Sequence, residues 1–190
     1  MIDWSRSVSV KIAAKIIGGG GVVAYPTEGV WGLGCDPFNE FAVRKILQLK
    51  ERSINKGLIL IGSAIGQFDF LLDDISDEKF QHLKKTWPGP FTWIVPHHQQ
   101  IPNWVSGNHS GVAIRVSDHP LVQALCNCYG GPIISTSANR QSKPSATTRL
   151  KVRCYFGRSP QLEFITPGVI GKNQRPSEIR DLNTMALVRA

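Results

Sequence analysis

The sequence has no hydrophobic run that approaches the roughly 20 residues needed to cross a bilayer, so no membrane segment is expected. Its N-terminal stretch also lacks the short apolar core and small-residue cleavage site of a signal peptide. The cysteines Cys35, Cys126, Cys128 and Cys154 do not have the spacing of a disulfide framework and are expected to be reduced thiols. Together these absences predict a cytoplasmic protein.

Fingerprints of several reaction classes are missing as well. There is no G-x-S-x-G elbow, no cysteine in a Cys/His context, no G-x-G-x-x-G and no G-K-[ST]. His97 and His98 are adjacent instead of spaced on one face, and Cys126-x-Cys128 has no partner pair at zinc spacing. We therefore expect neither a covalent nucleophile of these kinds nor a metal held by the protein.

Length, composition and periodicity favour one α/β domain over residues 1–190. The chain is 42% hydrophobic and 19% charged, which is typical of a globular protein. Helices and strands alternate irregularly, and several expected strand pairs have no helix between them, which predicts a mixed sheet. Helices are expected at 3–17, 39–50, 119–129 and 148–156, with two short ones after Ser63 and Ser76. Strands are expected at 22–25, 58–61, 91–95, 112–116, 132–135 and 162–165, with a closing hairpin of 177–182 and 185–189.

The stretch Val22–Asp36 is the first candidate for a ligand site. Its apolar strand is expected to end at Pro26, which has no N–H to donate. Two polar residues then precede a segment expected to be a glycine-rich loop: Thr27, Glu28, Gly29, Gly32 and Gly34. In α/β proteins such strand exits often bind ligands. An ordinary strand followed by a loop without a ligand site would have the same sequence pattern.

Charge and further strand exits point to an anionic ligand. Residues 140–190 carry 10 Lys and Arg against 3 Asp and Glu, whereas residues 1–139 carry 12 against 11. This basic third suits nucleotide phosphates or RNA, or it is simply a solvated basic face. Ser137 and Asn139 follow one strand, and Arg115 is on the non-core face of another. A cluster of cations near a helix end either binds phosphates or favours the helix C-terminus: Lys50, Arg52 and Lys56.

Six landmarks in order give the chain a resemblance to a known family. They are Tyr25-Pro26-Thr27-Glu28 with Gly32-Leu33-Gly34, Lys50-x-Arg52, Trp87 to Thr92 (WPGPFT), Ala113 to Pro120 (AIRVSDHP), Ser137-x-Asn139, and Pro176 to Asp181 (PSEIRD). This set resembles the YrdC/YciO family over essentially the whole chain, in particular its short bacterial form. The resemblance implies an open, twisted mixed sheet flanked by helices, with a concave, positively charged face.

The resemblance also implies an activity, that of a threonylcarbamoyl-AMP synthase. Such an enzyme is a nucleotidyltransferase that converts L-threonine, bicarbonate or CO2, and ATP to L-threonylcarbamoyladenylate and pyrophosphate, for N6-threonylcarbamoyladenosine at position 37 of tRNA. Mg2+ accompanies the ATP. The macromolecular partners expected are downstream tRNA threonylcarbamoyl transferase proteins, with tRNA or double-stranded RNA on the basic face.

Site roles follow from the same resemblance. Threonine would contact Thr27, Arg115 and Ser177. The catalytic set would be Lys50, Arg52, Ser137 and Asn139. The ATP side would comprise Lys50, Arg52, Lys56, Ser137, Asn139, Ser145 and Arg189. Which substrate each of Ser135, Ser137 and Ser177 contacts stays open.

Some positions depart from the family pattern. Gly29 stands where Thr or Ala is usual, Trp31 where Tyr or Phe is common, and Ser53 where Pro is frequent. Arg140-Gln141-Ser142 follows Asn139 in place of Leu-Ser-Gly, within the segment that leads to Ser145. Two alternatives remain open: an RNA-binding module without chemistry, and a YciO-like paralogue with other chemistry. The Ser177 motif and the compact length favour the synthase.

Overall fold

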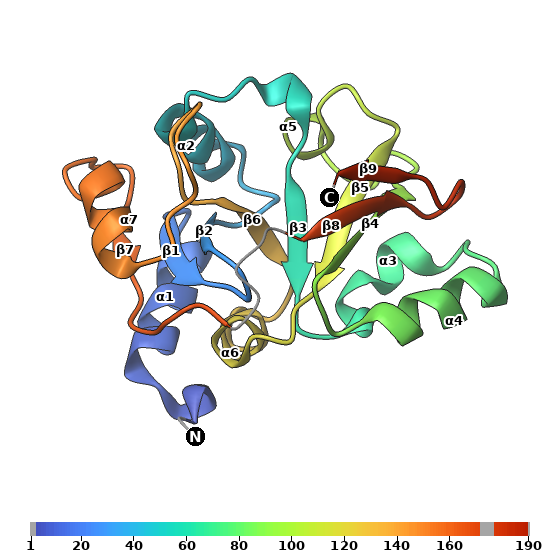
Figure 1. The fold of residues 1–190 in the computed structure, drawn as a ribbon, viewed down its shortest axis with the longest axis horizontal. Coiled ribbons are helices and arrows are strands. Elements are labelled where there is room, and N and C mark those ends of the chain that lie inside the picture. The colour runs from blue at the N-terminus through green and yellow to red at the C-terminus, as the bar shows by residue number, and fades with distance from the viewer. Residues whose placement is uncertain (1–2, 172–176, 190) are drawn as a thin grey trace.

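A mixed sheet forms the centre of the computed structural model, which describes residues 3–171 and 177–189. Within these residues, nine strands lie in the order β7-β1-β2-β6-β3-β5-β4-β8-β9 (Figure 1). They are β1 (Val23–Pro26), β2 (Trp31–Gly34), β3 (Ile59–Gly62), β4 (Phe91–Pro96), β5 (Gly111–Val116), β6 (Ile133–Ser137), β7 (Phe164–Ile165), β8 (Glu178–Asp181) and β9 (Leu187–Arg189). The pairs β1–β7, β3–β5 and β4–β8 are parallel and the others antiparallel, so the predicted mixed sheet is confirmed.

The helices begin and end close to the local signals in the sequence. They are α1 (Val8–Gly18), α2 (Glu40–Lys50), α3 (Asp69–Leu72), α4 (Asp77–Thr86), α5 (Asn103–Ser106), α6 (Pro120–Tyr129) and α7 (Arg149–Phe156), with 3-10 turns η1 (Trp4–Arg6), η2 (Ile54–Lys56) and η3 (Ile65–Phe68). Asn39 caps α2 by accepting from the backbone N–H of Ala42 at 3.1 Å. Gly130, at a φ of 94°, ends α6 in the left-handed region that favours glycine. Among the described helices, none has the length and apolar character needed to span a membrane.

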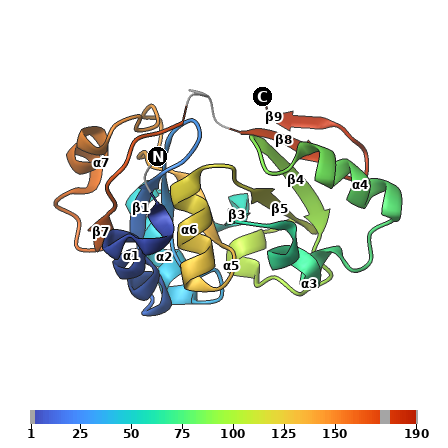
Figure 2. The same ribbon diagram turned by 90° about the horizontal axis from the view of Figure 1, so that it is seen from below.

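The two faces of the sheet carry different helices. Helices α1 and α6 pack together on one face, where their buried side chains join a cluster that includes Tyr25, Ile61 and Ile133. Neighbouring residues such as Leu60 and Ile134 belong to a larger cluster on the opposite face, with side chains from α2, α4 and α7. This division follows from the alternation of side chains along a strand. Figure 2 shows α1 and α6 lying side by side.

Two predicted loops contain regular structure. The segment expected to be a glycine-rich loop after Thr27 forms β2, which pairs with β1 from Val23–Gly34 to Pro26–Trp31. The glycine at position 34 is required by close packing, because a Cβ there would lie 2.6 Å from the carbonyl oxygen of Ile134. The segment between the strands expected at 91–95 and 112–116, where no helix or strand was expected, contains α5, which is anchored by buried Val105.

Other boundaries shift without changing the topology. The predicted strand 162–165 is reduced to β7, and the predicted helix 3–17 is divided into η1 and α1. Strand β6 continues to Ser137, further than the predicted end at residue 135. The closing hairpin is confirmed as β8 and β9. Pro176, the first residue of the C-terminal motif, lies outside the described residues.

Candidate active site

A cavity of about 1040 Å³ lies over the central strands. Alternating residues of β3, β5 and β6, whose side chains share one face of the sheet, line it: Ile59, Ile61, Ala113, Arg115, Ser135 and Ser137. Gly111, Val112 and Thr136 of the same strands contribute as well. Because Ile61 also belongs to the cluster packed against α1 and α6, the cavity continues the same sheet face beyond those helices. The fold therefore leaves part of this face free for ligands.

Most of the site residues predicted from the sequence line this one cavity. They are Thr27, Arg52, Lys56, Arg115, Ser137, Ser145, Ser177 and Arg189. They come from segments spread over more than 160 positions of the chain, from Thr27 after β1 to Arg189 in β9. Lys50 and Asn139 are not among the lining residues. The predicted set is thus brought together in space, with these two residues behind the cavity wall.

Lys50 holds the turn that carries Ser137 and Asn139. Its Nζ donates to the backbone carbonyl oxygens of Ser137 and Asn139, the latter at 3.0 Å, and to Oδ1 of Asn139 at 3.1 Å. These contacts use the three donors of the ammonium group. Burial, and secondarily Arg52, lower the pKa of Lys50 to about 8. In this arrangement Lys50 acts on a ligand through the turn it supports.

Asn139 and Ser137 are linked to each other as well as to Lys50. The Ser137 hydroxyl donates to Oδ1 of Asn139 at 2.6 Å, and Nδ2 of Asn139 donates to the carbonyl oxygen of Lys143 at 2.7 Å. This polar network fixes the exit of β6 and the segment that follows it. Ser145, further along that segment, lines the cavity although Arg140-Gln141-Ser142 stands in place of the usual Leu-Ser-Gly.

A cationic wall lies on another side of the cavity. Nη2 of Arg52 donates to the carbonyl oxygen of Gly57 at 2.9 Å, and Nη2 of Arg189 donates to that of Ser177 at 3.0 Å. Both arginines line the cavity, and burial first and Arg189 second lower the pKa of Arg52. With Lys56 they form a surface that suits a polyphosphate.

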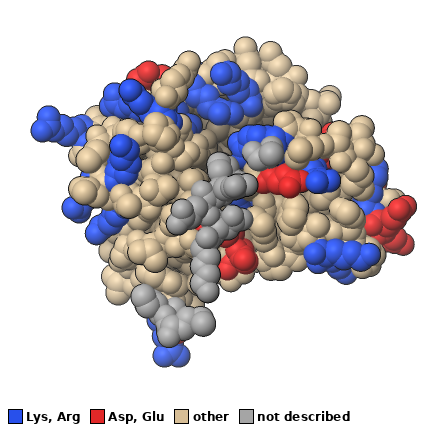
Figure 3. Space-filling view, viewed as in Figure 1, with Lys and Arg blue, Asp and Glu red and all other residues tan. Residues whose placement is uncertain are grey.

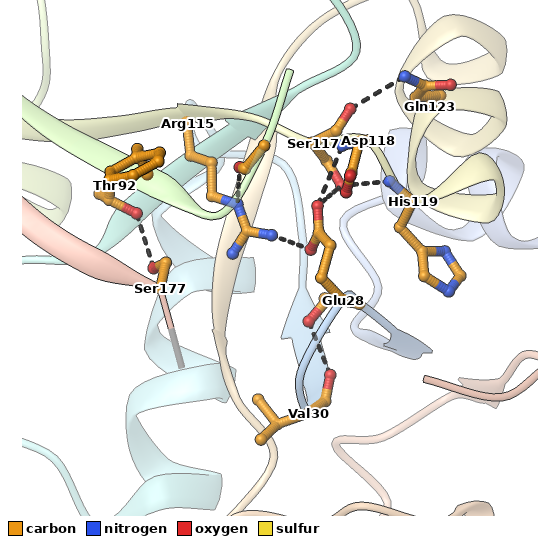
Figure 4. A network of polar contacts seen from close by, with 12 residues as sticks. Glu28, Val30, Thr92, Arg115, Ser117, Asp118, His119, Gln123 and Ser177 are labelled. Atoms are coloured by element: carbon orange, nitrogen blue, oxygen red, sulfur yellow. Dashed lines mark hydrogen bonds and ion pairs between the residues drawn. The ribbon is translucent and has the colours of Figure 1, made fainter. Parts of the chain in front are cut away.

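Arg115 is anchored from behind by a buried polar network (Figure 4). Its guanidinium forms an ion pair with Glu28 and donates from Nε to the carbonyl oxygen of Gly89 at 3.2 Å. Oε1 of Glu28 also accepts from the Ser117 hydroxyl at 2.6 Å and from the backbone N–H of Asp118 at 3.0 Å. Burial is the main cause that lowers the pKa of Arg115 to about 10, so it stays a cation at neutral pH.

Two hydroxyl groups lie on the same side as Arg115. Thr27 donates from Oγ1 to the carbonyl oxygen of Val30 at 2.7 Å, which orients its remaining lone pairs. Ser177 and Thr92 share a hydrogen bond of 2.7 Å between their hydroxyl oxygens. A cation beside oriented hydroxyls is suited to the carboxylate and hydroxyl of a small amino acid.

Sequence reasoning missed part of the cavity lining. His97, His98 and His109 contribute to one end of the cavity. They come from the segment between β4 and β5, and the ring Nε2 of His97 hydrogen bonds to the carbonyl oxygen of His109 at 3.0 Å. The signal in the sequence was the adjacent pair His97 and His98, but the place of this segment next to the cavity depends on antiparallel pairing of β4 and β5. Ser135, also a lining residue, was expected only as a hydrogen-bonding candidate.

Fold and cavity define an α/β domain with a site suited to a small polar ligand next to an anionic one. The family model Sua5/YciO/YrdC, described as telomere recombination, matches residues 15–190. The chain therefore belongs to the Sua5/YrdC/YciO family.

Curated relatives are similar over almost their full length. A Pseudomonas fluorescens protein named threonylcarbamoyl-AMP synthase is 54% identical over 180 residues, covering 95% of this chain and 96% of the relative. A Cellvibrio japonicus protein of the same name is 49% identical over 189 residues, covering 100% and 99%. The similarity thus includes all the segments that build the cavity.

Solved structures share the fold. P. abyssi Sua5 complexed with L-threonine matches with a TM-score of 0.87 and 32% identity, over 95% of this chain and 53% of that longer chain. E. coli YciO matches with a TM-score of 0.82 and 24% identity, over 95% and 87%. These matches confirm the fold expected from the resemblance.

Proposed function

We propose that this protein forms L-threonylcarbamoyladenylate and pyrophosphate from L-threonine, bicarbonate or CO2, and ATP, as a threonylcarbamoyl-AMP synthase. The observation that carries the proposal is the single cavity that joins Thr27, Arg115 and Ser177 to the cations Arg52, Lys56 and Arg189. Curated relatives about half identical over nearly the whole chain bear the name of this activity. The nucleotide product serves N6-threonylcarbamoyladenosine formation at position 37 of tRNA.

On the threonine side, Arg115 binds the carboxylate, with Thr27 and Ser177 near the polar groups of the amino acid. The neutral amine of threonine attacks CO2, and loss of a proton leaves a carbamate. Binding both reactants in one cavity favours this step by proximity. The structure of P. abyssi Sua5 with L-threonine supports a threonine site in this fold.

On the ATP side, Arg52, Lys56 and Arg189 neutralise the phosphates, and Ser137 and Ser145 supply hydroxyl groups. A carbamate oxygen attacks the α-phosphorus of ATP, the bond to the bridging oxygen breaks, and pyrophosphate leaves. Charge that develops on the leaving group is stabilised by cations already in place. No covalent intermediate on the protein is needed, which agrees with the missing nucleophile motifs.

Mg2+ enters this scheme with ATP as its substrate complex. Among the described residues, no group of three or more His, Cys, Asp or Glu side chains is placed to hold a metal ion. Asp181 is the carboxylate that lines the cavity. This donor set fits a Mg2+ that keeps phosphate and water ligands, the usual arrangement for this ion.

The test is pyrophosphate release by the purified protein with Mg-ATP, with and without threonine and bicarbonate. Release that requires both substrates supports the proposal. Normal ATP binding with no release when all substrates are present would rule it out. A YciO-like protein with other chemistry would give this second result. The relation to E. coli YciO is one of fold alone.

RNA and protein partners are part of the proposal. Exposed cations gather on α7 and the segments beside it, a surface we call the α7 basic face: Arg140, Lys143, Arg149, Lys151, Arg153 and Arg158. Figure 3 shows Lys and Arg side chains over this side of the molecule. We assign this face to binding of tRNA or double-stranded RNA. The Arg149→Glu/Arg153→Glu variant should bind such RNA more weakly than the parent, and its affinity should depend less on salt. Unchanged binding would leave a solvated basic face.

Handover of the adenylate to downstream tRNA threonylcarbamoyl transferase proteins, in the cytoplasm, completes the scheme. All four cysteines are free thiols in the structure, which suits a reducing compartment. A transferase that accelerates adenylate release in a mixed assay would support direct handover. Equal rates with and without transferase would favour diffusion.

A further inference from the structure

Glu28 is a buried carboxylate that lies behind the cavity and is not among the residues that line it. Figure 4 shows its side chain between Arg115 on one side and Ser117 and Asp118 on the other. It pairs with the guanidinium of Arg115 and accepts from the Ser117 hydroxyl and the Asp118 N–H. A buried carboxylate with this many partners is built into the site and needs an explanation.

We propose that Glu28 is the positioning residue of the threonine side, which acts by fixing the guanidinium plane of Arg115. Nη2 of Arg115 is held by Glu28, and Nε donates to the carbonyl oxygen of Gly89 at 3.2 Å. A planar group held at two of its three nitrogens has a fixed orientation, and Nη1 is the nitrogen left to face the cavity. The Arg115 side chain is therefore ordered before the ligand binds, so binding does not carry the entropic cost of ordering it.

The backbone beside this carboxylate is also held in place, at Thr27 and at Glu28 itself. The carbonyl oxygen of Thr27 accepts from the N–H of Gly171 at 3.0 Å, and a Cβ at position 171 would lie 2.9 Å from the carbonyl oxygen of Glu28. Glu28 thus joins the exits of β1 and β5 and the segment that leads toward β8. Arg52, in contrast, is anchored on Gly57, away from this network.

This separation of anchors predicts a selective effect, and the inference rests on the proposed function. Glu28→Gln keeps the size of the side chain and the acceptor for Ser117 and Asp118, but turns an amide toward Arg115. We expect the KM for threonine to rise by about 10- to 100-fold, the equivalent of one charge-assisted hydrogen bond. The KM for ATP should stay within about two-fold, because the ATP side has other anchors.

Glu163→Gln is the matched control. Glu163 also accepts from a backbone N–H, that of Val22 at 2.6 Å, and pairs with a cation, Lys45 at 2.8 Å, but it does not line the cavity. Its substitution should leave both KM values within about two-fold of the parent. A general cost of neutralising a carboxylate that accepts from a backbone N–H and pairs with a cation would instead raise the KM values of both variants.

A double-mutant cycle with Arg115→Met separates positioning from a merely structural role. If Glu28 acts through Arg115, Glu28→Gln should not weaken threonine binding further in this background, measured by calorimetry. If Glu28→Gln does not fold, Glu28→Asp is the second variant. Its carboxylate is one methylene shorter and should hold Arg115 less well, so the KM for threonine should rise and the KM for ATP should not.

Three outcomes would overturn the inference. They are an unchanged threonine KM in a folded Glu28 variant, equal rises for threonine and ATP, and additive losses in the Arg115→Met background. If the parent protein binds threonine and releases pyrophosphate, and the Glu28 variant does both equally well, only the positioning role is refuted. A parent that does neither refutes the proposed function and this inference with it.

Discussion

The arrangement around Lys50 predicts that Lys50→Met nearly abolishes turnover in a protein that still folds. The substitution leaves an apolar side chain of similar length and removes the donor from the carbonyl oxygens of Ser137 and Asn139. Oδ1 of Asn139 keeps a donor, the Ser137 hydroxyl. The turn between β6 and the following segment should therefore lose its anchor and keep its internal hydrogen bond.

The magnitude follows from the two carbonyl groups that lose a partner. The carbonyl oxygen of Ser137 keeps the backbone N–H of Asn139 as a donor at 3.0 Å, so only the carbonyl oxygen of Asn139 is left without one, at a cost of about 1–3 kcal/mol. Water can replace part of this loss because Asn139 is only partly buried, but the charge-assisted bond from Lys50 to Ser137 is lost as well, so we expect about 2–3 kcal/mol in total. For a domain of this size that lowers Tm by about 4–12 °C. Displacement of the turn should lower kcat by at least about 100-fold, since each tenfold corresponds to about 1.4 kcal/mol.

The assays are thermal unfolding and threonine-dependent pyrophosphate release, with Lys45→Met as the control. Lys45 is in the same helix and also contacts a backbone oxygen, that of Gly20 at 3.1 Å, but it pairs with Glu163 away from the cavity. Lys45→Met should lose stability and keep its turnover. A folded Lys50→Met protein with turnover within a few-fold of the parent would refute the reasoning.

Three further predictions concern the pH response of Lys50, the cation Arg52 and the close packing of Gly34. The pKa of Lys50 in the folded protein is about 8, below its ordinary value. Between pH 8 and 10 Lys50 is therefore more protonated in the unfolded chain than in the folded protein, so its contribution to the free energy of unfolding should increase with pH. Over the same range ATP binding should weaken as the ammonium is lost, and calorimetry should show this alkaline decline in the parent but not in Lys50→Arg. Arg52→Ala should raise the KM for ATP by about 10-fold or more, whereas Arg44→Ala, which removes an exposed pair with Glu40, should not. Gly34→Ala should cost about 1–3 kcal/mol or more in denaturant unfolding, because its Cβ would meet backbone 2.6 Å away. Gly18→Ala, in α1 with nothing within 4 Å of its Cβ, should not destabilise the protein.

The parts of the fold that were predicted depend on local signals. Helix α2 begins after the Asn39 cap, and α6 is bounded by Pro120 and Gly130, all visible in the sequence. Strand β2 was missed because glycines in a short segment usually indicate a turn. Gly34 is needed because β2 packs closely on β6, where a Cβ would meet Ile134, and Ile134 is 100 positions further along the chain.

The site was foreseen as a set of residues but not as a geometry. The family landmarks named side chains that the structure brings to one cavity, because strand exits on one sheet face converge there. The role of Lys50 was not predictable, since its acceptors lie 87 and 89 positions further along the chain. Glu28 appeared only as a polar residue after a strand, and its pairing with Arg115 depends on how β1 and β5 are placed in the sheet.

Transfer of labelled carbon from bicarbonate to a nucleotide tests the proposed function most directly. Purified protein would be incubated with [14C]bicarbonate, L-threonine and Mg-ATP, and the adenylate separated from ATP and AMP. The account predicts a labelled threonylcarbamoyl nucleotide formed in a one-to-one ratio with pyrophosphate, and none when threonine is omitted. Pyrophosphate released without label in the nucleotide would contradict the account.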